Sequence, residues 1–126
     1  MHRFSFGVAL LAAIGIIGIG VMYLLRPWAM THGFGLPVPE EGRNIAWWLR
    51  LKGSRDIVSG LVVLALVVWG SSHLLGIVLM IEALIPTGDM SLILAARGST
   101  RTAFFVHGLT AALMILAAIP LLIGAA

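Results

Sequence analysis

The chain has 126 residues, which suits a single domain, and 60% of them are hydrophobic whereas only 10% are charged. Soluble domains carry roughly 25% charged residues, so this composition excludes a mainly water-exposed surface and indicates that lipid is the main solvent. The absence of cysteine excludes a disulfide, a thiolate nucleophile and a cysteine metal site. The net charge of +3 rests on eight Lys and Arg, which cluster near expected helix ends and in one loop, as membrane topology favours. We therefore expect no nucleic-acid partner.

Residues 4–25 are predicted to form the first membrane helix. The apolar run holds about 22 residues, which is longer than the roughly 7–15 residues of a secretion signal and matches the ~20 residues that cross a bilayer. Arg26 and the proline after it end the helix. Three glycines inside it, Gly15, Gly18 and Gly20, are expected to let a neighbouring helix approach closely.

Residues 26–43 are predicted to form a loop. The stretch THGFGLPVPEEG combines glycine, proline and two carboxylates, and it shows no periodicity. A short re-entrant segment is the alternative for part of this loop.

Residues 44–70 are predicted to form the second helix, with Asn44 as its N-cap. Only the 13 residues 57–69 form an uncharged stretch, and this is too short to cross a membrane at ~1.5 Å per residue. Part of the charged half must therefore lie at membrane depth. Lys52 and Asp56 are four residues apart in that half and can pair along the helix.

Residues 73–97 and 101–123 are predicted to form the third and fourth helices. Glu82 and Asp89 are seven residues apart on the third helix, so they share one face of it at a separation of ~10.5 Å. Pro86 has no N–H group for the carbonyl of Glu82, which predicts a kink or a loosened turn at that point.

These elements predict an all-α integral membrane protein, a four-helix antiparallel bundle in which residues 1–126 form one membrane domain, since short connections imply antiparallel neighbours. The loops after the first and third helices carry arginines, whereas the opposite side carries only Arg3. The positive-inside rule therefore places those two loops in the cytoplasm and both termini outside it. The loop arginines are Arg26, Arg43, Arg97 and Arg101.

Charged groups at membrane depth are rare and mark functional sites. Counted at ~1.5 Å per residue from the nearer predicted helix ends, Asp56, Asp89 and His107 fall at nearly one level of the membrane, together with Arg55. Glu82 falls ~10 Å deeper by the same count. We therefore expect a polar cluster in the cytoplasmic half of the bundle, with Glu82 at its floor.

The carboxyl groups of this cluster are the predicted catalytic residues. Burial disfavours the charged form of a carboxyl, so Glu82 or Asp89 is a candidate proton donor, and Asp56 is a candidate for steadying a developing cation or removing the final proton. The alternative is a structural ion-pair network that holds the helices together. The predicted binding or supporting residues are Arg55, Lys52, His107, Trp48 and Ser59.

No metal or cofactor is expected. The histidine and the carboxylates of the cluster have no spacing that demands a metal ion, and the chain has no phosphate loop, nucleophile elbow or dinucleotide fingerprint. The expected partners are membrane lipid, a lipophilic small molecule and further copies of the chain.

Four segments, GFGLP, LRLKGSRDIVSG, ALIPTGD and VHGLTAA, together resemble a small bacterial and fungal family of membrane proteins that is catalogued as a domain of unknown function. That family is distantly similar to the DoxX-like four-helix membrane proteins. The resemblance covers most of the chain and implies a four-helix membrane fold. It implies no activity.

The favoured hypothesis is a membrane-embedded acid/base enzyme that cyclises or isomerises a lipophilic small molecule, such as an isoprenoid, sterol-like or quinone-like compound. A non-catalytic, DoxX-like accessory or ligand-binding subunit is the first alternative, and a small oligomeric transporter is the second. An enzyme needs an enclosed pocket into which Glu82, Asp56 and Asp89 point. A structural network needs every charge paired and no cavity.

Overall fold

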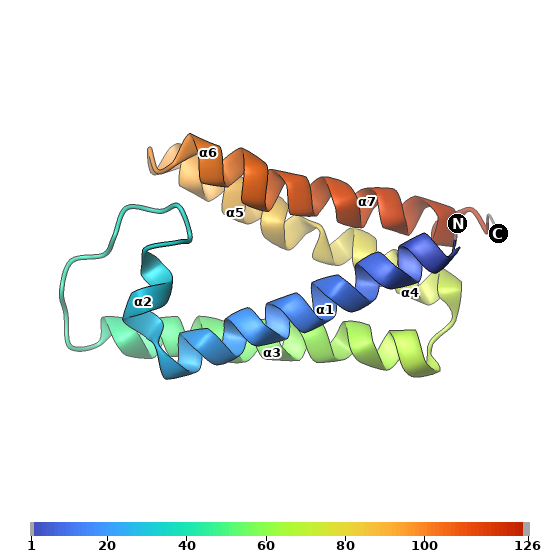
Figure 1. The fold of residues 1–126 in the computed structure, drawn as a ribbon, viewed down its shortest axis with the longest axis horizontal. Helices are drawn as coiled ribbons and strands as arrows, with labels where there is room; N and C mark the ends of the chain where they lie inside the picture. Colours follow the sequence, from blue (N-terminus) through green and yellow to red (C-terminus); the bar gives the residue numbers. More distant parts are fainter. Residues whose placement is uncertain (1, 125–126) are drawn as a thin grey trace.

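Every regular element of the described part of the chain, residues 2–124 of the computed structural model, is helical. A short helix follows the first long one directly, and one π-helical segment interrupts the last helical stretch. The elements are α1 (His2–Leu25), α2 (Pro27–Thr31), α3 (Ile45–Trp69), α4 (Ser72–Glu82), α5 (Leu84–Ala95), α6 (Thr100–Thr102), η1 (Ala103–Gly108) and α7 (Leu109–Leu122) (Figure 1).

Among residues 2–124, three helical stretches are long and apolar enough to cross a membrane: α1, Ser72–Ala95 and Thr100–Leu122. The second stretch consists of α4 and α5, and the third of α6, η1 and α7. α3 has 25 residues, but four charged residues interrupt it between positions 50 and 56. Because a charge at the centre of a membrane helix costs roughly 2.5–3.5 kcal/mol, these groups need partners within the protein if α3 lies at the same depth as α1.

α1 and α3 pack along each other, with backbone against backbone at glycines. A side-chain carbon at Gly20 would lie 2.6 Å from the carbonyl oxygen of Gly53, and one at Gly53 would lie 2.6 Å from that of Gly20. Gly60 meets the α1 backbone in the same way. The expectation of close packing is thus confirmed for Gly20 but is wrong for Gly15 and Gly18, which have no neighbouring atom within 4 Å of such a carbon because they do not face α3.

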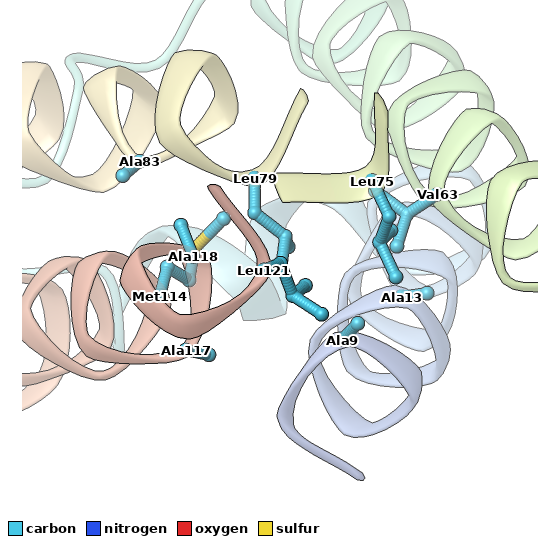
Figure 2. Packing of buried hydrophobic residues seen from close by; sticks show 10 residues of the cluster. All are labelled: Ala9, Ala13, Val63, Leu75, Leu79, Ala83, Met114, Ala117, Ala118 and Leu121. Carbon is cyan, nitrogen blue, oxygen red and sulfur yellow. The ribbon is translucent and has the colours of Figure 1, made fainter. Parts of the chain in front are cut away.

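The apolar core lies at the end of the molecule where α1 begins and α7 ends (Figure 1). α7 packs there against α4 and α1. Figure 2 shows Leu75 and Leu79 of α4 and Leu121 of α7 directed into the space between the helices. The cluster consists of Ala9, Ala13, Val63, Leu75, Leu79, Ala83, Met114, Ala117, Ala118 and Leu121. This cluster holds the helices together at one end of the molecule, and it does not extend to the other end.

At that other end the helices diverge. α5 packs against η1, and Figure 1 shows this pair separating from α1 and α3 toward the end that α2 and the following loop occupy. The loop is fixed to the α5–α6 connection, since the Ser99 N–H donates a hydrogen bond to the Gly35 carbonyl at 2.8 Å. Gly98 lies against the same carbonyl with no room for a side chain. The connection itself is a Schellman turn, in which Arg97 takes a left-handed φ of 57° and Gly98 N–H bonds to Ile93.

The helices follow the sequence expectation at one notable place and depart from it at two others. The predicted third helix divides at Ala83, one turn before Pro86, which confirms the loosened turn. α2 lies inside the predicted loop, where Pro27 at its first position suits a helix start. Nothing in the pattern of apolar residues indicated the π-helical turn Ala103–Gly108.

Candidate functional site

A cavity of about 450 Å³ lies between α1 and α3 on one side and α5 and η1 on the other. We call it the chamber. Most of its wall is aliphatic, with α1 contributing the largest share and Ile85, Val106 and Met114 closing the far side. Its volume lies within the usual range of small-molecule sites. The titratable side chains that line it are Tyr23, Lys52, Asp56, Glu82, Asp89 and His107.

An ion pair within α3 faces the chamber. The Nζ atom of Lys52 lies 2.7 Å from Oδ2 of Asp56, one turn further along the helix. The Asp56 side chain is 12% exposed and that of Lys52 is 33% exposed, so the carboxylate is the more deeply held of the two. The four-residue spacing predicted this pairing, which the structure confirms.

Two aromatic rings enclose the same ammonium group. The Nζ atom of Lys52 lies 4.2 Å from the centroid of the Tyr23 ring and 5.1 Å from that of the Phe34 ring. Tyr23 comes from the last turn of α1, and Phe34 comes from the loop after α2. Both distances are within the range of cation–π attraction.

His107 is fixed in one orientation by the same loop. Its Nε2 atom lies 3.0 Å from the Phe34 carbonyl oxygen, and because a carbonyl only accepts hydrogen bonds, Nε2 carries the proton that is donated. Nδ1 therefore faces Oδ2 of Asp89, at 3.7 Å. The rings of Phe34 and His107 are in contact as well, with centroids 4.6 Å apart.

The π-helical turn η1 presents His107 to the chamber. Such turns are rare in proteins, and those that occur are often found at functional sites. They hold one more residue than an α-helical turn, so residues before and after the turn that share a face of the helix no longer follow the 3.6-residue spacing. Gly108 at the end of η1 lets α5 approach, since a side-chain carbon there would lie 3.0 Å from the sulfur of Met90. The wide turn and the glycine together bring His107 close to α5.

Glu82 stands at the boundary between the chamber and the outside of the helices. It is the last residue of α4, at the break before α5, and Ser59 of α3 lines the same hollows as Glu82. Both residues line the chamber and also a second hollow of about 480 Å³, which holds Arg55 and Ile81 as well. We call this second hollow the outer groove.

Six of the eight predicted site residues line the chamber, and two do not. Arg55 is exposed, lines the outer groove and makes no salt bridge within the described residues, so Lys52 and not Arg55 is the partner of Asp56. Successive residues of a helix point about 100° apart, which turns Arg55 outward when Asp56 points inward. Trp48 is 70% exposed and lines neither hollow. The six are Glu82, Asp56, Asp89, Lys52, His107 and Ser59.

Tyr23 and Phe34 were not predicted as site residues. Tyr23 is the only tyrosine of the chain and lies near the end of an otherwise aliphatic helix, which is a weak signal for a polar site. The glycines on either side of Phe34 gave no indication that the loop folds back over the helices. Among residues 2–124, no three His, Asp or Glu side chains are placed to hold one metal ion.

Replacing Lys52 by methionine is expected to destabilise the protein by about 3 kcal/mol, because it leaves the buried carboxylate of Asp56 without its partner. The matched control is Arg55→Met, which removes the same charge three residues away on the outside of α3 and is expected to change stability by less than about 0.5 kcal/mol. Thermal unfolding of both purified variants in detergent measures the difference. Equal losses in the two variants would contradict the assignment of Lys52 as the partner.

The fold and the site together define an all-helical protein with helices long enough to cross a membrane and a mainly apolar cavity that carboxyl groups of several helices line. The chain belongs to the DUF4267 family, a domain of unknown function, whose model matches residues 13–122. This confirms the expected membership of a family with unknown function, and the match includes every titratable residue of the chamber. No curated protein and no solved structure matches the chain.

Proposed function

We propose that this protein is a membrane enzyme that carries out acid/base chemistry on a lipophilic small molecule held in the chamber. One observation carries this proposal: carboxyl groups from α3, α4 and α5, those of Asp56, Glu82 and Asp89, line a single chamber with mainly apolar walls. A set of charges that served only to join helices would need no chamber. Apolar walls with a few convergent polar groups are typical of sites for small hydrophobic ligands.

In the same proposal, α3 crosses the membrane as a fourth span, and the long helices form an antiparallel, DoxX-like bundle. α3 is as long as α1 and packs along it, and its charged pair Lys52–Asp56 faces the chamber instead of lipid. The arginines at positions 26, 43, 97 and 101 gather at the end that carries α2. The positive-inside rule assigns that end to the cytoplasm and both termini to the opposite side.

The three carboxyl groups take different roles because their partners differ. Glu82 forms no salt bridge within the described residues, so we assign it the general acid that donates a proton to a carbon atom of an alkene in the substrate. Asp56 is held as an anion by Lys52 and stabilises the cation that this protonation creates. Asp89, beside His107, accepts the proton lost when a new double bond forms. Transfer of that proton back to Glu82 completes the cycle.

The outer groove offers a route for the substrate. It opens on the outer face of α3 and α4–α5 and shares Ser59, Glu82 and Ile85 with the chamber. A molecule dissolved in the membrane would thus meet the general acid on its way in. This route spares the substrate any passage through water.

The experiment is a comparison of lipophilic extracts from membranes that contain the wild-type protein or no protein. Membranes are incubated in D₂O, and products are detected by mass spectrometry. Protonation of substrate carbon by an acid in exchange with solvent incorporates deuterium, so a compound that forms only with the protein and carries deuterium supports the proposal. If no such compound forms from a broad panel of isoprenoids, sterols and quinones, the catalytic proposal is wrong.

A ligand-binding accessory subunit is the second candidate. It is favoured by the observation that two of the three carboxyls already face a basic partner, Lys52 for Asp56 and His107 for Asp89. A lipophilic compound that copurifies unchanged with the protein, with no deuterated product, would select this candidate.

A further inference from the structure

The ammonium group of Lys52 occupies a position that is suited to a cation. It lies 2.7 Å from the Asp56 carboxylate, 4.2 Å from the centroid of the Tyr23 ring and 5.1 Å from that of the Phe34 ring. Aromatic faces together with a carboxylate are the groups with which proteins recognise alkylammonium ligands. We call this position the cation site.

The charges around the cation site leave room for a second positive group. With Glu82 protonated as the general acid, the carboxylates of Asp56 and Asp89 line the chamber against the single ammonium of Lys52, so carboxylates outnumber ammonium groups. Asp89 lies close enough to Lys52 and Asp56 to interact with both electrostatically. Within the described residues its carboxylate accepts no hydrogen bond, and its nearest basic atom, Nδ1 of His107, is 3.7 Å away.

The Lys52 side chain is able to leave the cation site. It is 33% exposed, and its flexible four-carbon stem lets the ammonium move away from Asp56 toward the end of the bundle that carries α2. A ligand cation that took its place would keep Asp56 paired and the two rings covered. The apolar remainder of the chamber, about 450 Å³ in all, would hold the hydrocarbon part of the same ligand.

We propose that the chamber binds lipophilic monocations, with the positive group at the cation site and the hydrocarbon part against α1, and that Lys52 is the internal stand-in for this group. The proposal rests on the proposed function in one respect: it takes the ligand to be lipophilic. It adds the class of ligand, namely molecules that are cationic or that become cationic during the reaction. An anionic amphiphile of the same length meets the carboxylates of Asp56 and Asp89 and is rejected.

The test measures binding of dodecyltrimethylammonium, below its micelle concentration, to the full chain in phosphatidylcholine nanodiscs by calorimetry. Protein-free nanodiscs correct for partition into lipid, and dodecanol is the neutral probe of equal chain length. We expect the ammonium to bind at least tenfold more tightly than the alcohol. Asp89→Asn and Tyr23→Leu should each weaken ammonium binding about tenfold and leave dodecanol binding unchanged, whereas Trp69→Leu, at the far end of α3, should change neither.

The Lys52→Met variant gives a second readout, which does not depend on affinity alone. Its expected loss of stability comes from the unpaired Asp56 carboxylate, so the ammonium probe should raise its melting temperature more than that of the wild type, and dodecanol should not. Equal binding of the two probes, or equal stabilisation of both proteins, would overturn the inference. Deuterated product without a preference for the cation would refute the inference and keep the proposed function. Selective ammonium binding without any product would support the inference and refute the proposed function.

Discussion

Replacing Glu82 by glutamine is expected to lower turnover by a factor of about 10²–10⁴, which is the usual contribution of a general acid. Glutamine has nearly the same shape and can still form hydrogen bonds, but it has no acidic proton to give. Asp89→Asn is expected to have an effect of similar size, because it removes the group that accepts the final proton. The measurement is the rate at which the deuterated product forms in membranes that hold equal amounts of each protein.

The matched control for these variants is Glu41→Gln, which makes the same change at an exposed position of the loop after α2. It should keep full turnover. Size-exclusion profiles and melting curves in detergent show whether each protein is folded. A folded Glu82→Gln protein with wild-type turnover would remove Glu82 from the mechanism, and loss of the folded protein in both Glu82→Gln and Asp89→Asn would favour a structural role for these carboxyls.

Replacing Gly20 by valine is expected to destabilise the protein by at least about 3 kcal/mol, because backbone atoms of α3 lie where the new side chain must go. The first added carbon would be 2.6 Å from the carbonyl oxygen of Gly53, and a helix backbone cannot yield as a flexible side chain does. α1 and α3 would have to move apart, which would also widen the chamber between them and the opposite pair of helices.

Gly18→Val serves as the control, since it adds the same side chain two residues away on a face of α1 with open space. The loss of a glycine inside a helix makes this control neutral or slightly stabilising. Melting temperatures of the two variants in the same detergent decide the matter. A Gly20→Val protein as stable as Gly18→Val would show that the two helices are not in backbone contact.

The sequence was informative wherever spacing along a single helix determines the contact. The four-residue interval predicted the pair of Lys52 and Asp56, and Pro86 predicted the break in the helix that begins at Ser72. Counting residues from the helix ends placed Asp56, Asp89 and His107 at one depth, and all three line the chamber. Depth follows from the rise per residue, which is nearly constant in helices.

The direction in which a residue points around its helix was much harder to predict. Arg55 and Asp56 have the same depth, yet one lines the outer groove and the other the chamber, and no apolar stripe in α3 distinguishes them because lipid and protein interior are equally apolar. Contacts made by loops could not be predicted from the sequence, for a different reason. Phe34 reaches Lys52 and His107 only because the loop after α2 folds back onto the α5–α6 connection.

In the π-helical turn Ala103–Gly108, the number of residues determines which side chains point into the chamber. The turn holds one residue more than a regular α-helix would, so deleting one residue from it would restore a regular α-helix while α7 keeps its place in the apolar core. The remaining side chains of the turn would then shift around the helix axis by up to about 100°. A chain shortened by one residue here should therefore keep its fold and lose the contact between His107 and Asp89, although every other side chain of the chamber is still present.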